Sequence, residues 1–314
     1  MGPRGPPGGG VAIDAPALAR EAGPDGARAG TGRASSTLVI SKPGIAAGVA
    51  ASGLAGMVLA GNGLPDGRTA ALGLGCIVAA ASGAAIVNGL FDAPLDARMR
   101  RLSRRVAALR AVGERGALAL SLVLIAAALA VSYLYLNVLA ALLILAAVLS
   151  YSFLYTLYLK RRSPYGTIPG GVPGALPVLV GYAAASGRIG LPGLVLFFVM
   201  LLWQPPHFWT LALKYQEDYR AAGIPAMPVA LGEPYTRILI FVYAVALLPL
   251  STALWVFGYC SGFFAGAAAL LWVCFVRSCY RNAVATRRFG KAFGASIVYM
   301  MGLLAAVIVD VAAR

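Results

Sequence analysis

Charged residues are scarce in this sequence. Only 12% of the 314 residues are Asp, Glu, Lys or Arg, while 60% are hydrophobic and the mean hydropathy is +0.80. An ordinary soluble domain contains about 25% charged residues, and too few polar residues remain here to cover the surface of a water-soluble fold of this length. The composition therefore excludes a soluble globular protein and indicates a chain that lies within a membrane.

Residues that commonly bind catalytic metals or act as nucleophiles are also few. There is one histidine, and the four cysteines form no C-x-x-C pair, so zinc-ligand spacing is absent. Because all four lie in or beside apolar runs, we interpret them as small helix residues: Cys76, Cys260, Cys274 and Cys279. The sequence also lacks a G-x-x-x-x-G-K-[ST] loop, a G-x-S-x-G elbow and a dinucleotide fingerprint. The enzyme classes that these motifs identify are not supported.

Long apolar runs, in contrast, fill most of the chain. A membrane-spanning helix needs about 20 mostly apolar residues, so the sequence predicts an all-α integral membrane protein with one domain, residues 37–314. We expect nine transmembrane helices, at 44–62, 69–90, 117–136, 138–158, 168–186, 192–213, 236–257, 259–279 and 292–312. Residues 1–36, rich in Gly, Ala, Pro and Arg, are predicted to be a disordered tail. Gly44, Gly48 and Gly56 recur at helical spacing, which would let the first helix approach a neighbour closely.

The basic residues are divided unequally between the two sides of this predicted bundle. The N-terminal segment and the loops after the second, fourth, sixth and eighth helices contain 23 of the 26 Lys and Arg residues. By the positive-inside rule that side is cytoplasmic, which places the N-terminus inside. The net charge of +15 is explained by this topology and by attraction to anionic membrane lipid. A nucleic-acid partner is not expected, because no binding module is visible.

Three polar side chains at the end of the second predicted helix are the first candidate site. Asn88, Asp92 and Asp96 are spaced i, i+4, i+8, so a helix places them on one face. Two carboxylates and an amide suit Mg²⁺, which is usually held by one or two carboxylates together with substrate phosphates. The arginines that follow predict a diphosphate clamp. Pro94 lies within this ladder and is expected to kink or end the helix.

Two further clusters lie on the same predicted side of the membrane. In the first, Lys214 and Asp218 are spaced i, i+4, and His207 lies seven residues before Lys214. His207 is either a buried helix residue or an axial, propionate or proton-transfer contact to an acceptor substrate. In the second, Tyr155 and the basic triplet that begins at Lys160 precede a stretch rich in Pro and Gly. Either Tyr155 and Lys160 reach a phosphate, or the triplet serves only as a positive-inside topology signal.

The motifs that join these clusters are SKPGIAAGVAASGLAGMVLA at 41–60, N-x-x-x-D-x-x-x-D at 88–96, SYSFLYT at 150–156, LKRRSPYGTIPGGVPGALP at 159–177 and WQPPHFWTLALKYQEDYRAAGIPAMPV at 203–229. With them, the chain resembles the UbiA superfamily of intramembrane prenyltransferases over nearly everything after residue 36. N-x-x-x-D is shared across that superfamily, whereas the WQPPHFW run is specific to the branch that modifies haem.

The resemblance implies a UbiA-type bundle in the cell inner membrane, with a cytoplasmic active site. Farnesyl diphosphate would be the donor, haem B the acceptor, haem O the product, Mg²⁺ the cofactor and a haem A synthase a further partner. The roles that it implies are catalysis by Asp92, Asp96, Asp218 and Lys214; metal binding by Asn88, Asp92, Asp96 and Asp218; diphosphate binding by Arg101, Arg105, Lys160, Arg161 and Tyr155; and haem binding by His207.

The chain departs from the family pattern in two places. Ser103 stands where the family usually has an arginine, although Arg101 and Arg105 keep their places. Lys214 stands where the wider superfamily has an aspartate of a second D-x-x-x-D motif, so one Mg²⁺ is better supported than two. The rival activities are prenyl transfer to another acceptor, such as a quinone precursor, and ion-coupled transport. Transport is disfavoured because the acidic residues lie at helix ends.

Overall fold

The computed structural model describes residues 32–314, and within this range every regular element is a helix. The predicted tail lies outside the described residues up to residue 31, and its residues 33–36 form the first turn of helix α1. Among these described residues, nine helices are long and apolar enough to span a membrane, as the sequence predicted. The spanning segments are Pro43–Gly61 (α2), Gly67–Asp96 (α3), Glu114–Tyr135 (α5), Val138–Arg162, Pro164–Ser186, Leu191–Lys214 (α9), Glu233–Val256 (α12), Gly262–Ala285 and Phe289–Ala312 (α14).

Three of the spanning segments are composed of more than one helical type. The fourth joins α6 (Val138–Leu149), the π-helix η4 (Ser150–Leu159) and α7 (Lys160–Arg162). The fifth begins with the 3₁₀ turns η5 (Pro164–Thr167) and η6 (Pro169–Gly171), where Pro and Gly are frequent, and continues as α8 (Val172–Ser186). The eighth joins α13 (Gly262–Ser278) to a second π-helix, η7 (Cys279–Ala285).

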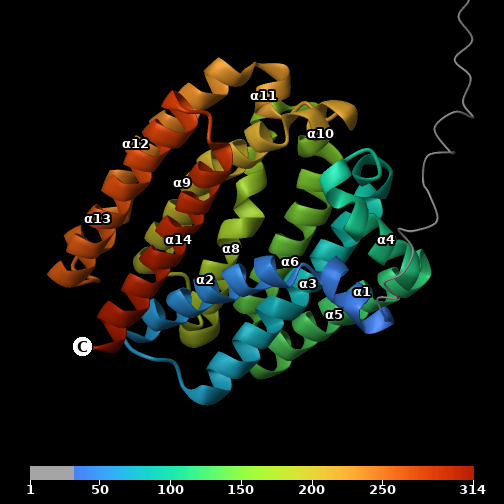
Figure 1. The fold of residues 1–314 in the computed structure, drawn as a ribbon. Helices are drawn as coiled ribbons and strands as arrows, with labels where there is room; N and C mark the ends of the chain where they lie inside the picture. The colour runs from blue at the N-terminus through green and yellow to red at the C-terminus, as the bar shows by residue number, and fades with distance from the viewer. Residues whose placement is uncertain (1–31) are drawn as a thin grey trace, which may run out of the picture.

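Five short helices were not predicted from the sequence. They are α1 (Arg33–Ser41), η3 (Arg100–Leu102), α4 (Ser103–Val112), α10 (Gln216–Ala221) and α11 (Met227–Ala230). Each is too short to give a clear apolar period, and α1 and α4 are fixed by packing instead. Ile40 of α1 and Leu109 of α4 are buried in one small apolar cluster with Ile86 of α3. Figure 1 shows α4, α10 and α11 at one end of the bundle, opposite the C-terminus.

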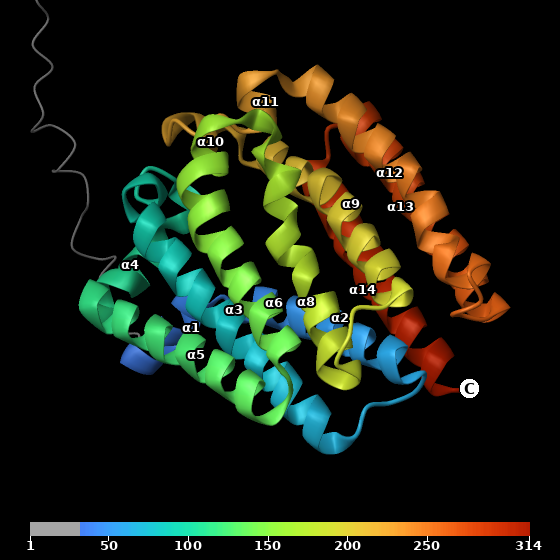
Figure 2. The same ribbon diagram turned by 180° about the vertical axis from the view of Figure 1, so that it is seen from behind.

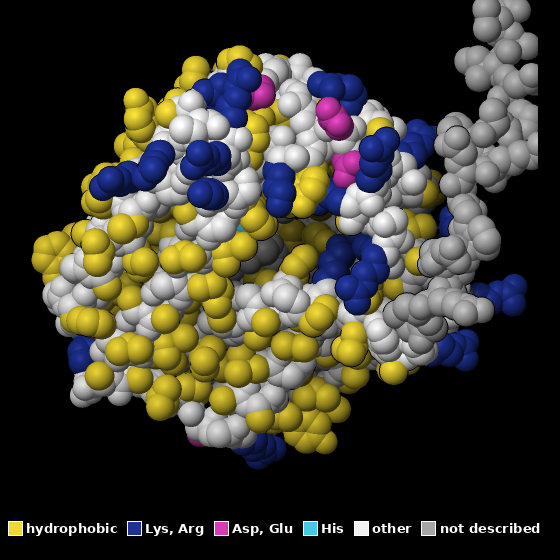
Figure 3. Space-filling model, viewed as in Figure 1, with side chains coloured by type: hydrophobic (Ala, Val, Ile, Leu, Met, Phe, Trp, Pro, Cys, Tyr) yellow, Lys and Arg dark blue, Asp and Glu magenta, His cyan; other side chains and the backbone are white. Residues whose placement is uncertain are grey.

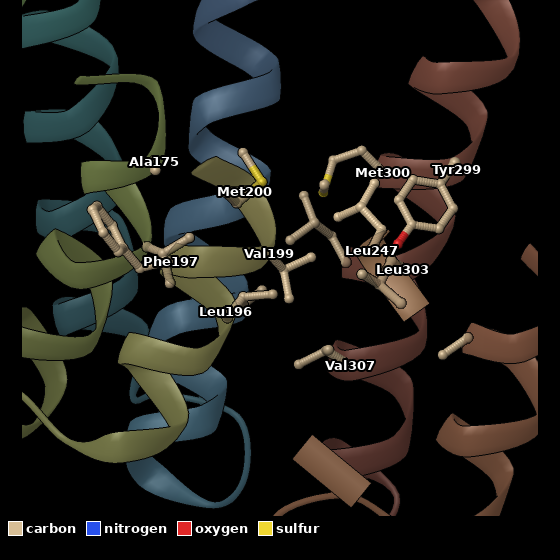
Figure 4. Close-up of a cluster of buried hydrophobic side chains, with 14 of the residues drawn as sticks. Ala175, Leu196, Phe197, Val199, Met200, Leu247, Tyr299, Met300, Leu303 and Val307 are labelled. Carbon is tan, nitrogen blue, oxygen red and sulfur yellow. The ribbon is translucent and has the colours of Figure 1, made fainter. Parts of the chain in front are cut away.

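The largest apolar core lies between α2, α8, α9, α12, α13 and α14. Figure 4 shows Leu196, Val199 and Met200 of α9 facing Met300 and Leu303 of α14 across this core. The second group of helices, α3, α5 and α6, packs on the other side of α8, as Figure 2 shows from behind. Large apolar side chains remain exposed along the outer helices, among them Leu118, Leu122 and Val123 of α5. Such an exterior suits lipid, and the chain is a multi-pass membrane protein.

Side-chain caps explain how consecutive spans reverse direction with few residues between them. The Asn137 amide oxygen accepts a hydrogen bond from the Ala140 N–H (2.9 Å), which caps α6, and its Nδ2 donates to the Ala183 carbonyl oxygen (2.8 Å). Asp66 caps α3 by accepting from the Thr69 N–H (3.0 Å). Capping satisfies amide groups that have no partner within the helix. The hairpin at 135–138 therefore confirms two separate spans there.

Candidate functional site

Asn88, Asp92 and Asp96 form a buried polar ladder on α3. The side chains are 4%, 0% and 2% exposed, and the Asn88 Nδ2 donates to the Asp92 Oδ2 at 2.8 Å. Pro94 does not end α3 at that residue, because the helix continues to Asp96. The sequence-predicted face is therefore intact. Two carboxylates in an apolar bundle are costly unless they are paired, so their partners decide what this ladder does.

Basic side chains from two other elements cover the ladder. The Lys160 Nζ lies 2.6 Å from the Asp92 Oδ2, and the Arg161 Nη2 lies 3.5 Å from the Asp92 Oδ1. Arg105 of α4 pairs with Asp96 (2.9 Å) and donates to the Asn88 amide oxygen (3.2 Å). Its guanidinium rests against Gly89, where a Cβ atom would meet the Arg105 Nη2. The predicted diphosphate-binding residues Arg105, Lys160 and Arg161 are thus brought together with the ladder.

Lys42 is a member of this site that the sequence reasoning missed. Its Nζ donates to the Asn88 amide oxygen at 2.8 Å and lies 3.5 Å from the Tyr151 hydroxyl. Burial, and then the charges of Arg105 and Lys160, lower the pKa of Lys42 to about 7. Its backbone is left-handed (φ +51°) and joins α1 to α2. The sequence feature that could have indicated Lys42 is its position at the start of the first span, on the same side of the membrane as the ladder.

The π-helix η4 supplies the wall that faces the ladder. The Asn88 Nδ2 donates to the Thr156 Oγ1 (3.0 Å), and the Thr156 hydroxyl donates to the Tyr151 carbonyl oxygen (2.7 Å). The ring of Tyr155 stacks on that of Tyr151 with centroids 6.1 Å apart. π-Helical segments are rare and often occur at functional sites. Here the altered register turns Thr156 toward Asn88 and delivers Lys160 to Asp92.

Arg101 and Asp218 form a second wall beside the ladder. The Asp218 carboxylate accepts hydrogen bonds from the backbone N–H groups of Arg100 and Arg101 at 3.2 and 3.3 Å, and it lies 3.6 Å from the Arg101 Nε. Arg101 also donates to the Tyr219 hydroxyl (3.0 Å). The Asp218 side chain therefore contacts the segment that follows α3. Asp218 forms no ion pair with Lys214. Ser103 is exposed at the start of α4.

Lys214 and Asp218 do not share a continuous helix face. Helix α9 ends at Lys214, Tyr215 leaves the helical conformation, and α10 begins at Gln216. The expectation based on i, i+4 spacing was wrong here, because the chain breaks between the two residues. The Lys214 Nζ lies 5.0 Å from the centroid of the Tyr215 ring, and Lys214 lines a separate depression beside α14.

His207 lies in the middle of a three-ring stack between α9 and α14. The Trp203 and Phe293 rings cover its two faces with centroids 4.3 and 4.6 Å away. Its Nδ1 lies 2.7 Å from the Ser296 Oγ, and the Ser296 hydroxyl donates to the Phe293 carbonyl oxygen at 2.6 Å. With the serine proton in that bond, the tautomer that fits carries its proton on Nδ1, which then donates to the serine oxygen. The Nε2 atom is then left with its lone pair, and it makes no hydrogen bond within residues 32–314.

The charges of the site favour an anionic ligand. Five cations, Lys42, Arg101, Arg105, Lys160 and Arg161, stand around three carboxylates, Asp92, Asp96 and Asp218. Within the described residues, no group of three His, Cys, Asp or Glu side chains is close enough to hold a metal. The oxygen donors of the ladder fit Mg²⁺, provided that a phosphate ligand completes its coordination. Metal and diphosphate are therefore expected to bind together.

Comparisons with known proteins agree with this geometry. The sequence model of the UbiA prenyltransferase family matches residues 49–305. The protoheme IX farnesyltransferase of Geotalea uraniireducens is 54% identical over 258 residues, which cover 82% of this chain and 100% of that protein. The fold is also similar to a solved structure of a digeranylgeranylglyceryl phosphate synthase. The match covers 90% of this chain and 99% of the synthase chain, with 18% sequence identity and a TM-score of 0.72. A second similar structure is a UbiA homologue from Archaeoglobus fulgidus bound to DMAPP and Mg²⁺. The match covers 86% of this chain and 98% of the homologue's chain, with 13% sequence identity and a TM-score of 0.62.

Proposed function

The chain belongs to the UbiA prenyltransferase family, and from this premise we propose that it transfers a farnesyl group from farnesyl diphosphate to a vinyl group of haem B, giving haem O. The observation that carries the proposal is the 54% identity to a protoheme IX farnesyltransferase over all of that protein. An acceptor such as a quinone precursor is not favoured, because it leaves this identity unexplained. Haem A synthase remains a predicted partner as the consumer of haem O.

The five cations and three carboxylates of the site would receive the donor's diphosphate. Lys42, Arg105, Lys160 and Arg161 now contact the ladder and are placed to turn toward phosphate oxygens. Their charge would stabilise the diphosphate as the carbon–oxygen bond of the donor breaks. The farnesyl carbon then bonds to the terminal vinyl carbon of haem, water adds its oxygen to the neighbouring carbon, and one proton leaves.

Mg²⁺ is the metal that we propose for this site. Asn88, Asp92 and Asp96 would hold it, because they are the buried oxygen donors that lie on one face. Once bound, the ion would neutralise charge on the leaving diphosphate. Mg²⁺ in the Archaeoglobus homologue's structure supports a divalent ion in this fold. Asp218 has a different role in our proposal, since it fixes Arg101 and the amide groups of η3.

His207 is the residue that we propose for contact with the haem acceptor. Its Nδ1–H is engaged by Ser296, which orients the ring and leaves Nε2 as an electron-pair donor. This is the arrangement in which a histidine binds iron, with its other nitrogen donating a hydrogen bond.

Replacing His207 by Ala should raise the KM for haem about tenfold or more, because the nitrogen that would bind the iron is removed; a tenfold change corresponds to about 1.4 kcal/mol. The KM for farnesyl diphosphate should not change. Haem titrations followed by absorption spectroscopy should also lose the spectral signature of nitrogen ligation. Ser296→Ala, which removes only the orienting partner of Nδ1, is the matched variant and should have a smaller effect. An unchanged haem spectrum in His207→Ala would return His207 to a packing role.

The overall activity is tested by expression in a host that lacks haem O, followed by mass spectrometry of the extracted haems. We expect a product heavier than haem B by one farnesyl group and one hydroxyl group. Haem B alone, from correctly inserted protein supplied with farnesyl diphosphate, would overturn the proposed acceptor.

We further propose that the end of the bundle with the ladder faces the cytoplasm. The distribution of Lys and Arg supports this orientation. Reporter fusions after Arg314 check it, since the C-terminus would then lie outside.

A further inference from the structure

An open depression of about 460 Å³ lies where the end of α9 meets the start of α14. It is lined by Lys214, Arg287, Arg288, Phe289, Gly290 and Lys291. Four of these six residues are cationic and none is acidic. Figure 3 shows Lys and Arg side chains around a hollow on the face that presents α14.

Most of this positive charge has no counter-charge among residues 32–314. Arg287 pairs with Glu233 at 2.8 Å, whereas Lys214, Arg288 and Lys291 form no ion pair with any described residue. Like charges that converge on one cavity repel each other, and an anion bound between them relieves that repulsion. The first N–H groups of α14, a 24-residue helix without a side-chain cap, add to the favourable field.

Aromatic side chains follow the depression along α9 and α14 into the bundle. Phe293 lies one helical turn after Phe289 on α14, and His207 lies two turns before Lys214 on α9. Phe293 and His207 are in direct ring contact, so packed aromatic rings lie between the cationic depression and the interior of the bundle at His207. The ligand of the depression should therefore combine carboxylates at one edge with a large apolar body.

The depression also adjoins the diphosphate side of the site. The Arg101 guanidinium carbon lies 4.7 Å from the centroid of the Tyr215 ring, and the Lys214 Nζ lies 5.0 Å from the same centroid. One ring therefore separates a cation of the depression from a cation of the donor site. A molecule anchored in the depression would have its far edge available to a donor bound near the ladder.

We propose that this depression is the carboxylate subsite of the acceptor, in which Lys214, Arg288 and Lys291 bind the two propionates of haem. The inference rests on the proposed function, since it assigns residues to that acceptor. The propionates and the vinyl groups lie on opposite edges of the porphyrin, so anchoring the propionates at the mouth directs the vinyl edge inward. Lys214 then belongs to acceptor binding instead of the catalytic group in which the resemblance places it.

The experiment compares haem B with its dimethyl ester, in which both carboxylates are neutral. The variant Arg288→Gln/Lys291→Gln removes two exposed cations of the depression. The matched control Arg281→Gln removes an exposed cation from η7, outside the depression. KM and kcat are measured for each acceptor at saturating farnesyl diphosphate, in vesicles with and without anionic lipid. Haem affinity is measured separately by absorption titration without the donor.

In the double variant, the KM and the dissociation constant for haem should rise about five- to tenfold. The KM for farnesyl diphosphate should stay unchanged, and the control should match the unmodified protein. The unmodified protein should discriminate against the ester by a similar factor, and the double variant should not discriminate. Equal discrimination in both proteins would overturn the assignment. The assignment would also be overturned if the double variant lost activity only in vesicles with anionic lipid, and lost it equally with haem B and its ester. That result would assign the depression to lipid headgroups. Absence of any farnesylated haem from the unmodified protein would instead refute the proposed function.

Discussion

Replacement of Asp92 by Asn is expected to slow farnesyl transfer about a thousandfold while the protein still inserts and folds. Asp92 is fully buried, it contacts both Lys160 and Arg161, and it is the central member of the ladder. Asparagine keeps the shape but removes the negative charge that would hold a divalent cation. Loss of one electrostatic stabiliser of a reacting group typically costs about 10²- to 10³-fold, and here the metal is expected to be lost as well.

The same substitution tests how the metal is held. Mg²⁺ binding by calorimetry should be weak in the unmodified protein alone and strong when a non-cleavable farnesyl thiodiphosphate is present, since the described protein groups cannot complete the coordination. Asp92→Asn should abolish this coupling. Asp310→Asn is the matched control, because Asp310 is also buried and paired with an arginine, but at the opposite end of the bundle. Normal turnover and normal Mg²⁺ dependence in Asp92→Asn would refute the metal assignment.

Local properties of the sequence predicted most of the fold. The length of apolar runs predicted all nine spans, because each span must satisfy its own backbone hydrogen bonds in lipid. The ladder was predicted for a similar reason, since i, i+4 spacing needs only one helix. The short helices α1 and α4 were missed, because they depend on a small cluster with α3 and not on their own periodicity.

The partners of the ladder depend on how helices cross, which the sequence does not state. Lys42 reaches Asn88 across 46 residues, and Thr156 reaches it across 68. The resemblance grouped Lys160 and Arg105 with the ladder, and the structure shows both side chains in contact with it. It could not show that the chain breaks at Tyr215, which turns Lys214 toward α14 and Asp218 toward η3.

The contact of α2 with α8 shows both what glycine spacing can predict and what it cannot. Of the three predicted glycines, Gly56 lies at the contact, where a Cβ would overlap the Val178 carbonyl oxygen. Gly44 and Gly48 have open space around them, so the prediction for them was wrong. The closest approach is between Gly181 of α8 and Gly53 of α2, because a Cβ on Gly181 would overlap the Gly53 carbonyl oxygen.

Substitution of Gly181 by Ala, a single added carbon, is therefore expected to destabilise the protein by about 3 kcal/mol. The added atom meets backbone, which cannot rotate away as a flexible side chain can, so α2 and α8 must move apart. Loss of this contact should also move Lys42, at the start of α2, away from Asn88, so the folded fraction should show lower activity.

Thermal unfolding and gel filtration of the solubilised protein measure the effect of Gly181→Ala. Gly48→Ala is the matched control on α2, where the new Cβ meets no atom within 4 Å, and it should leave stability unchanged or raise it by up to about 1 kcal/mol. If both variants unfold at the same temperature, the backbones of α2 and α8 do not approach as closely as described. If Gly181→Ala is unstable but its folded fraction is fully active, the position of Lys42 does not depend on this contact.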